Sequence, residues 1–311
     1  MNTLVTGGAG FIGSHLVDRL IELEHKVIII DNLTTGKKTN INPRAQFYEM
    51  DINDEKLVQV FEKYKPNYLF HLAAQVNVRK SVKDPLYDAR SNIMGTINLL
   101  TRCRDFKVNK FIFSSSGGVI YGDTEEPAVE DSTLRPISPY GVAKLAGEGY
   151  VKCFGEWENL NYTILRYANV YGPRQDPKGE AGVVSIFIGQ LLRGEKSTLY
   201  GYGKLERDYV FVGDVVEANV ACLEKGRGSV YNIGTGLATS VNDLYTIISA
   251  IIKKENEKEL EPKRSGELTR NVLNIEKAKK ELGWKPEVSL NDGLRQTYEW
   301  FITDTNSENG N

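Results

Sequence analysis

Tyr140 and Lys144, four residues apart, are the side chains in this sequence best suited to acid–base chemistry as a pair. On a helix, positions i and i+4 lie on one face, so the ammonium would lie close to the phenol. A free tyrosine has a pKa of about 10 and is a poor base at neutral pH, but a neighbouring positive charge favours the phenolate. Ser114, Ser115 and Ser116 precede this pair, and a serine hydroxyl could relay the proton. Ser115 and Ser116 both remain candidates for that relay.

Three glycines near the amino terminus, Gly7, Gly10 and Gly13, have the spacing of a dinucleotide-binding turn. They lie between an apolar run and an amphipathic stretch, the strand–turn–helix context that such a turn requires. Gly7 permits the tight turn, Gly10 lets the backbone approach a pyrophosphate, and Gly13 lets the helix pack on the strand. Phe11 and Ile12 begin that helix, whose N–H groups and positive dipole would hold the phosphates.

An acidic residue, Asp31, ends the next apolar run and indicates which dinucleotide is bound. Its carboxylate can accept hydrogen bonds from both ribose hydroxyls and would repel a 2′-phosphate, which favours NAD over NADP. Asn32 follows it where an NADP site would have arginine, although Lys37 and Lys38 leave NADP open. After the third apolar run, Asp51-Ile52 could contact the adenine.

Alternating strands and helices would place these residues around one sheet. The β-branched strands are continuously apolar, as in a parallel sheet covered on both faces. The alternation predicts an α/β, Rossmann-type doubly wound parallel sheet over residues 1–172. We expect strands at 2–6, 26–30, 46–50, 68–72, 110–113 and 162–166, and helices at 14–23, 55–63, 86–104 and 140–157.

A smaller α+β portion, residues 173–303, follows and would bind substrate beside the carboxyl ends of the strands. Part of the chain, around 205–235, is expected to return to the first domain. The polar residues 304–311 predict a flexible tail. Helices are expected at 182–193, 213–224, 240–253 and 289–301.

Composition excludes several classes of protein. The net charge is -2, from 39 basic and 41 acidic residues that are interspersed, so a nucleic acid is not an expected partner. No apolar run approaches the ~20 residues needed to cross a membrane. Cys103, Cys153 and Cys222 have no CxxC spacing, and the three histidines have no metal-ligand spacing. We expect a cytoplasmic protein whose chemistry uses neither a metal nor a histidine base.

Several motifs together resemble the extended short-chain dehydrogenase/reductases, specifically the UDP-glucose/UDP-galactose 4-epimerases. They are TGGAGFIGSH at 6–15, the serine segment that ends in Tyr121 and Gly122, the YxxxK of Tyr140, and the Arg-Asp-Tyr at 207–209. The resemblance covers residues 1 to about 301 and implies NAD as cofactor and a UDP-sugar as substrate. The extra residue before Tyr121, relative to the family's commoner spacing, leaves the choice between Ser115 and Ser116 open.

The resemblance also implies roles for individual residues. Tyr140 and Lys144 would be catalytic, and Lys144 would anchor the nicotinamide ribose. Beyond the glycine turn, the implied NAD contacts are Asp31, Asn32, Asp51, Ile52, Leu72, Ala73, Ala74, Asn92, Ser114, Tyr140, Lys144 and Tyr167. The implied substrate contacts are Ser116, Tyr140, Asn169, Val184, Tyr200, Arg207, Arg264, Glu267 and Asn271.

The chemistry of the substrate supports part of this assignment. Planar guanidinium groups, here Arg207 and Arg264, suit a diphosphate, although each could also be a surface charge. Tyr200 matches an aromatic residue that lies against uracil. Asn271 matches a gate near the sugar's C2 substituent, where a small residue admits an N-acetyl group; alternatively, Asn271 faces solvent. Ser265 replaces the proline usual after Arg264, which weakens that match.

The residues around the serine segment discriminate among related reactions. A 4,6-dehydratase needs an Asp-Glu pair where this chain has Gly117 and Gly118, and a decarboxylase needs a glutamate where it has Val119. Oxidation and re-reduction at C4, which is epimerisation, remains. A net oxidoreductase that exchanges free NAD(P)H and a non-catalytic NAD-sensing protein are the alternatives.

The resemblance further implies a homodimer in which helices 86–104 and 140–157 of two copies form a four-helix bundle. The apolar positions Ile93, Ile97, Leu100, Ala143 and Tyr150 are compatible with that interface. They could equally face their own sheet.

Overall fold

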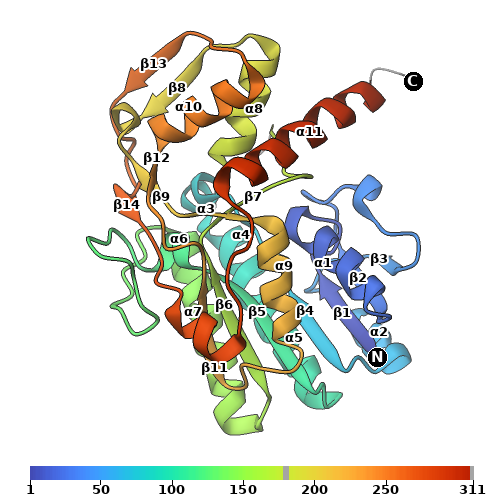
Figure 1. Cartoon of the computed structure of the whole chain (residues 1–311). Helices are drawn as coiled ribbons and strands as arrows, with labels where there is room; N and C mark the ends of the chain where they lie inside the picture. Colours follow the sequence, from blue (N-terminus) through green and yellow to red (C-terminus); the bar gives the residue numbers. More distant parts are fainter. Residues whose placement is uncertain (178–181, 309–311) are drawn as a thin grey trace.

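In the computed structural model, which describes residues 1–177 and 182–308, a parallel sheet of seven strands is the centre of the described chain (Figure 1). Its order, β11-β6-β5-β4-β1-β2-β3, contains the Rossmann arrangement, so the predicted fold class is confirmed. The strands are β1 (Asn2–Thr6), β2 (Lys26–Asp31), β3 (Gln46–Glu49), β4 (Tyr68–His71), β5 (Lys110–Ser116), β6 (Tyr162–Tyr167) and β11 (Ser229–Ile233).

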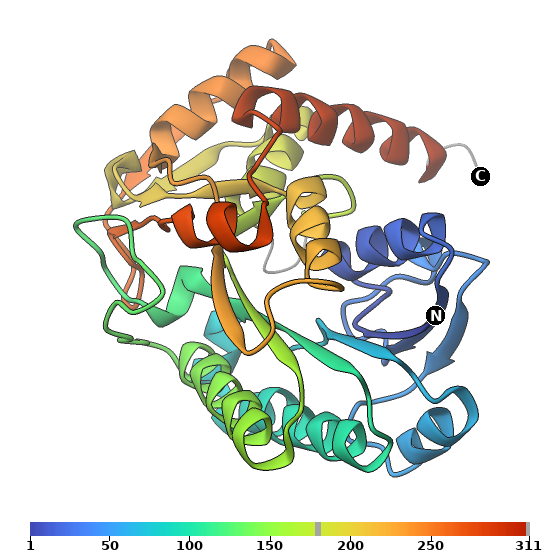
Figure 2. The same ribbon diagram turned by 60° about the horizontal axis from the view of Figure 1, so that its bottom comes forward.

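Helices cover both faces of the sheet (Figure 2). One face packs on α1 (Phe11–Glu22) and α9 (Val212–Ala221), and the other on α2 (Leu57–Tyr64), α5 (Gly95–Asp105) and α7 (Pro139–Glu158). Successive strand residues alternate between the two apolar cores: Val5 and Ile29 lie in the first, Leu4 and Ile28 in the second. Because both faces are buried, the strands have the continuous apolar runs seen in the sequence.

The helix predicted over 86–104 is present, with a π-helical turn inside it. It comprises α4 (Pro85–Ala89), the π-helical turn η2 (Arg90–Met94) and α5, which follow one another without a gap; a short helix before them, α3 (Val78–Lys83), was not predicted. Asp84 ends α3 and caps α4 by accepting a hydrogen bond from the Tyr87 N–H at 3.0 Å. Pro85 follows at the first helical position, where its missing N–H costs nothing.

The end of β5 and the start of α7 position the serine segment and Tyr140. Strand β5 continues through the three serines to Ser116, three residues beyond its predicted end, and is followed by the short helix α6 (Gly117–Ile120). Helix α7 begins at Pro139 because Ser138 caps it, accepting a hydrogen bond from the Gly141 N–H at 3.1 Å.

The smaller portion encloses a third apolar cluster beneath α8 (Val183–Arg193), α10 (Val241–Ile252) and α11 (Leu290–Glu308), with β8 (Ser197–Tyr200) paired to β13 (Lys258–Glu261). Helix α9 and strand β11 return to the main sheet from within residues 205–235. The polar segment from Asp304, expected as a flexible tail, continues α11 to Glu308. The remaining elements are η1 (Lys38–Asn40), β7 (Asn169–Tyr171), η3 (Gly201–Gly203), β9 (Glu206–Arg207), β10 (Tyr209–Phe211), β12 (Thr239–Ser240), β14 (Arg270–Asn271) and η4 (Ala278–Leu282).

Among the described residues, no helix is both long enough and apolar enough to span a membrane.

Candidate active site

The glycine turn between β1 and α1 has little room for side chains. Gly7 has a φ of 73°, and a Cβ there would lie 2.7 Å from the backbone nitrogen of Ala73. A Cβ on Gly13 would lie 2.1 Å from the Gly7 carbonyl oxygen. Gly10 immediately precedes Phe11, the first residue of α1. The helix therefore packs closely on the strand, and its amino-terminal N–H groups can approach a phosphate, as a dinucleotide requires.

Asp31 lies beside this turn, at the carboxyl end of β2. One of its oxygens accepts a hydrogen bond from the Ala9 N–H at 3.0 Å and the other from the Leu33 N–H at 2.8 Å. Burial raises the pKa of Asp31. Asn32, the next residue, donates to Asp51 at 2.8 Å, which ties the segments after β2 and β3 together. These positions fit an adenosine ribose held by the Asp31 carboxylate.

The cofactor residues predicted further along the sheet follow β4 or lie in η2. The Leu72 N–H, at the start of residues 72–74, donates to the Thr6 carbonyl at 3.1 Å. Asn92 is buried and exchanges two 2.9 Å hydrogen bonds with the backbone of Gln75. Its Nδ2 also donates to Asp88 at 3.0 Å. The Asn92 amide is therefore held rigidly. Ile52 is buried and packs against η2 and α5 at Gly95.

Ser114 and Tyr167, also predicted as cofactor contacts, are buried with their hydroxyls 3.1 Å apart. The Nδ2 of Asn219 donates to the Tyr167 hydroxyl at 2.8 Å. This pairing joins β5 and β6 to α9, so both side chains have packing roles between these elements.

Tyr140 and Lys144 lie on one face of α7, turned toward β5. The Tyr140 N–H donates to the Ser81 hydroxyl at 3.1 Å, which anchors the start of α7 on α3. The Lys144 ammonium donates to the Ser114 carbonyl at 2.8 Å and lies 6.0 Å from the centre of the Tyr140 ring. The Ser116 hydroxyl is close enough to the Tyr140 phenol to lower its pKa. The structure thus brings the predicted catalytic serine, tyrosine and lysine together.

Burial dominates the electrostatics of this group. It raises the pKa of Tyr140, and the nearby Asp88 carboxylate raises it further, whereas the Ser116 hydrogen bond lowers it. Burial also lowers the pKa of Lys144 to about 8, against the charges of Asp88 and Glu148, which raise it. The ammonium is therefore mostly protonated at neutral pH, and its charge is easily lost above pH 8.

The two candidate relay serines differ in what they bind. The Ser115 hydroxyl donates to the Glu148 carboxylate at 2.6 Å, and Glu148 forms a doubly hydrogen-bonded ion pair with Arg166 at 2.9 and 2.7 Å. Arg166 also donates to the Tyr121 hydroxyl at 2.7 Å. Adjacent strand residues point to opposite faces, so Ser115 is directed into this network and Ser116 toward Tyr140. The geometry favours Ser116 as the relay, because the Ser115 hydroxyl is bound to Glu148.

On the substrate side, two short strands place Arg207 beside Asn271. The residues pair directly between β9 and β14. Arg207 donates to the Leu268 carbonyl at 2.7 Å. Asn271 is buried, and its amide donates to the carbonyls of Gly117 and Gly122 at 3.2 and 3.3 Å. Asn271 therefore does not face solvent; it is packed against the segment that follows the catalytic serine.

Asp208, between Arg207 and Tyr209, fixes this part of the chain. Its carboxylate accepts hydrogen bonds from the Thr235 N–H at 2.8 Å, the Thr235 hydroxyl at 2.6 Å and the Gly236 N–H at 3.1 Å. It thereby joins β9 to the loop after β11.

Tyr200, Arg264 and Glu267 form a separate cluster. The Arg264 guanidinium lies 3.8 Å from the centre of the Tyr200 ring and forms an ion pair with Glu267. The charge of Arg207 acts on the same carboxylate. Hence the residues predicted to contact the uracil, the ribose and the diphosphate of the substrate are neighbours, and in this structure they bind one another.

The two glycines after Ser116 face different environments. A Cβ on Gly118 would lie 3.2 Å from the Asn169 amide oxygen and 3.7 Å from the Ser116 hydroxyl. A Cβ on Gly117 would lie 2.7 Å from the Leu273 side chain, in the protein core. Only Gly118 of this pair borders the predicted sugar site.

Comparison with known proteins identifies the family. The profile of the NAD dependent epimerase/dehydratase family matches residues 3–234. The chain belongs to this family.

Three solved structures of family members are similar over nearly the whole chain. A UDP-glucose 4-epimerase of Thermotoga maritima, solved with UDP-glucose, is 50% identical, with a TM-score of 0.96 over 98% of this chain and 100% of that one. A Thermus thermophilus UDP-glucose 4-epimerase, complexed with NAD, is 41% identical, with a TM-score of 0.93 over 97% and 99% of the chains. A UDP-N-acetylglucosamine 4-epimerase of Methanobrevibacter ruminantium, complexed with UDP-N-acetylmuramic acid, is 36% identical, with a TM-score of 0.93 over 97% and 98%.

One predicted substrate residue of this family member has a fully buried side chain, and one candidate was missed. The Val184 side chain lies in the apolar core beneath α8, against which Tyr200 also packs. Tyr209 is also buried, yet its hydroxyl has no hydrogen-bond partner among the described residues, and the charge of Arg207 acts on it. A buried, unpaired hydroxyl beside a predicted phosphate ligand is a candidate substrate contact. Its place in the Arg-Asp-Tyr motif was the available signal.

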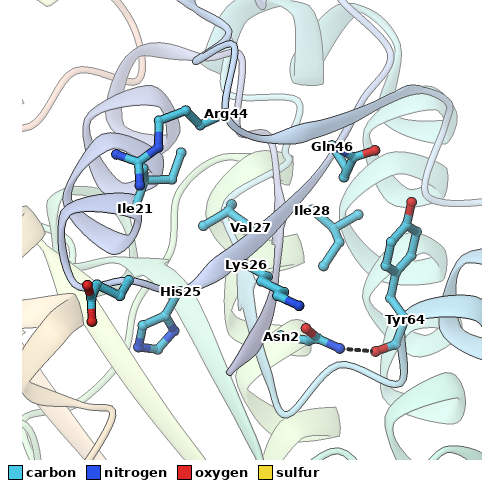
Figure 3. Close-up of a pocket in the computed structure, with 10 residues that line it drawn as sticks. Asn2, Ile21, His25, Lys26, Val27, Ile28, Arg44, Gln46 and Tyr64 are labelled. Atoms are coloured by element: carbon cyan, nitrogen blue, oxygen red, sulfur yellow. Dashed lines mark hydrogen bonds between the residues drawn. The ribbon is translucent and has the colours of Figure 1, made fainter.

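A hollow of about 380 Å³ lies at the amino ends of the strands of the main sheet, opposite the candidate active site (Figure 3). Asn2, Lys26 and Gln46, which line it, are the first residues of β1, β2 and β3. In parallel α/β sheets, ligands bind at the carboxyl ends of strands, where the glycine turn and the predicted catalytic residues of this family member lie. The hollow is therefore separate from the candidate site.

Proposed function

We propose that this chain is a UDP-sugar 4-epimerase that interconverts UDP-glucose and UDP-galactose through a 4-keto intermediate. The observation that carries the proposal is the group of Ser116, at the end of β5, with the buried side chains of Tyr140 and Lys144. This group lies at the same edge of the sheet as the glycine turn and has no second acid–base pair next to the serine. Chemistry at C4 alone needs no other proton donor. The likeness to the Thermotoga maritima enzyme solved with UDP-glucose supports the same substrate class.

Each catalytic residue has a distinct task in this proposal. Tyr140 takes the proton of the sugar's 4-hydroxyl and later returns it, and Ser116 relays it between them. Lys144 holds positive charge beside the phenol and keeps α7 joined to β5 through the Ser114 carbonyl. NAD, when bound, would supply the hydride acceptor and a positive charge that favours the phenolate. The close packing at Gly7 and Gly13 and the carboxylate of Asp31 fit that cofactor.

In the proposed substrate site, the residues that now bind one another would change partners when the UDP-sugar binds. A UDP-sugar diphosphate would draw the Arg264 guanidinium away from Glu267 and the Tyr200 ring. That movement would free the ring for uracil and the carboxylate for the ribose hydroxyls. Arg207 would hold the diphosphate from β9, and Tyr209 has a free hydroxyl nearby. We therefore expect Tyr200, Arg264 and Glu267 to bind one another when no substrate is present, and the UDP-sugar to replace those contacts.

The space beside the sugar supports a wider substrate range. Gly118 places no side chain between Asn169 and Ser116, and Asn271 is small and folded back against Gly117. We propose that UDP-GlcNAc and UDP-GalNAc are also substrates. The similar Methanobrevibacter ruminantium protein is a UDP-N-acetylglucosamine 4-epimerase.

The decisive experiment is incubation of the purified protein with UDP-Glc, UDP-Gal, UDP-GlcNAc and UDP-GalNAc, with products resolved by chromatography. We expect each sugar to yield its C4 epimer without net absorbance change at 340 nm. Steady NADH production would indicate a net oxidoreductase. Bound NAD with no turnover of any of the four sugars would indicate a non-catalytic protein.

We also propose that the chain forms a homodimer through α4, α5 and α7. Leu100 and Ala143, which were compatible with the interface, are buried within the subunit, whereas Tyr150 is exposed. Leu86 is 82% exposed and Trp157 is 86% exposed, which is costly for large apolar side chains in a lone subunit. Light scattering should give twice the chain mass, and a charge at Tyr150 should give a monomer. A wild-type monomer at assay concentration would contradict the proposal.

We propose a cytoplasmic location, where the free cysteines, including the exposed Cys153, would stay reduced.

A further inference from the structure

Helix α4 contributes a buried carboxylate, Asp88, to the region behind the catalytic pair. The residue is 1% exposed. Its Oδ1 accepts hydrogen bonds from the Gln75 side chain at 2.7 Å and the Asn92 side chain at 3.0 Å. Helix α4 packs directly against α7. Both donors are neutral amides, so they fix the carboxylate in place without cancelling its charge.

Two buried carboxylates act on Lys144, and they differ in what neutralises them. Glu148, one turn further along α7, is paired with Arg166 through both of its oxygens. That ion pair is internally neutral, and the Ser115 hydroxyl adds a further hydrogen bond. Asp88 forms no ion pair among the described residues, and neither does Lys144. A buried charge without a counter-charge is costly, so the charges of Asp88 and Lys144 stabilise each other.

We propose that Asp88 is a positioning residue that acts through Lys144: its carboxylate is the counter-charge that keeps the buried ammonium protonated. It thereby sets the pH range in which Tyr140 and Lys144 work together. The inference rests on the roles of these two residues in the proposed function. Neither the composition nor the motifs of the sequence indicated Asp88, because α4 and α7 are brought together only by folding.

Other ionisable groups lie on the elements around this pair. On α7, Tyr140 and Lys144 both interact with Asp88. On α3, Lys80 lies over the Tyr87 ring, and the charge of Arg79 acts on Glu267. The η2 residue Arg90 acts on Asp51.

The charge of Lys144 also acts on His71 of β4. This histidine stays neutral, because burial lowers its pKa to about 3. It contributes no charge at working pH. The Asp88 charge, by contrast, raises the pKa of Lys144 and also that of Tyr140.

The test is the pH dependence of kcat/KM for the Asp88→Asn holoenzyme with UDP-galactose. Loss of the carboxylate lowers the pKa of Lys144, so the alkaline limb of the profile should move to lower pH. It also lowers the pKa of Tyr140, so the acid limb should move in the same direction. We expect the whole profile to shift by about one pH unit, the size typical of a nearby buried charge. KM for the UDP-sugar should change little, because Asp88 is not among the predicted substrate contacts.

Matched variants separate this effect from a structural one. Asp88→Glu keeps the charge and should keep the wild-type profile. Asp84→Asn removes a carboxylate from the exposed start of the same helix and should leave the profile unchanged. Tm and bound NAD content show whether each variant is folded.

An Asp88→Asn enzyme that folds and loses activity equally at all pH values, or keeps an unshifted profile, would overturn the proposal. The proposed function fails separately, if Tyr140→Phe retains its activity.

Discussion

The candidate catalytic group and the cluster predicted to bind uridine use charged side chains in opposite ways. Next to Ser116, Arg166 and Glu148 are almost fully buried and bind each other, and Arg166 also donates to the Tyr121 hydroxyl and the Glu130 carbonyl. In the uridine cluster of Tyr200, Arg264 and Glu267, the ion pair is partly exposed, at 40% and 21% for the two side chains. The reacting atoms need a rigid environment, whereas the groups that bind substrate need partners that can be exchanged.

The largest expected effect is loss of the base in the rigid region. Tyr140→Phe should lower kcat by ~10²–10⁴, the range for losing a general base. Affinity for UDP should remain near wild type, because the uridine cluster is untouched. Chromatographic epimerase assays and calorimetric UDP titration measure the two quantities. Near-full activity in this variant would exclude Tyr140 as the base.

Breaking the buried ion pair should affect stability next most strongly. Glu148→Ala leaves the Arg166 charge buried and unpaired, and we expect a loss of about 3–5 kcal/mol in the free energy of unfolding. Glu195→Ala is the control, because it breaks the exposed pair with Arg193 and should change the free energy of unfolding little. Urea denaturation compares them. Equal losses would mean that burial does not distinguish the two pairs.

In the uridine cluster, a substitution should weaken substrate binding and leave the catalytic rate nearly unchanged. Arg264→Lys keeps a positive charge but loses the planar fork and the stacking on Tyr200, so KM should rise about tenfold with kcat nearly unchanged. Arg193→Lys, at the end of α8, serves as the control. A fall in kcat at constant KM would show that Arg264 acts on the reacting sugar instead.

The smallest effect should be a change of sugar preference at Gly118. Gly118→Ala adds a methyl group 3.2 Å from Asn169, which should disfavour N-acetylated sugars by about 1–3 kcal/mol relative to UDP-galactose. Asn271→Tyr should act in the same direction, but it also removes hydrogen bonds to two backbone carbonyls. The ratio of kcat/KM for the two sugars is the measurement. An unchanged ratio in Gly118→Ala would remove this position from the sugar site.

Much of the fold was predictable, because its signals are local. Apolar runs and the Gly7–Gly13 spacing predicted the strand–turn–helix order, and the family and its NAD dependence are confirmed. The roles of the individual site residues remain predictions. The π-helical turn at Arg90–Met94 was not predicted, because it lies within the helical pattern of 86–104.

Residues whose role depends on a distant partner were not predictable from the sequence. Ser115 and Ser116 are chemically identical, and only the strand's orientation sends one hydroxyl to Glu148 and the other to Tyr140. Gly117 and Gly118 are separated in the same way, one facing Leu273 and the other Asn169.

The sequence by itself determined two features of this chain: a dinucleotide turn and a tyrosine–lysine pair on one helical face. Those inferences need only the spacing of neighbours along one element. The tertiary structure decided which serine meets the tyrosine, which glycine borders the sugar, and that Asp88 lies behind Lys144. Each of these depends on the packing of elements far apart in the sequence, and burial there makes single charges strong.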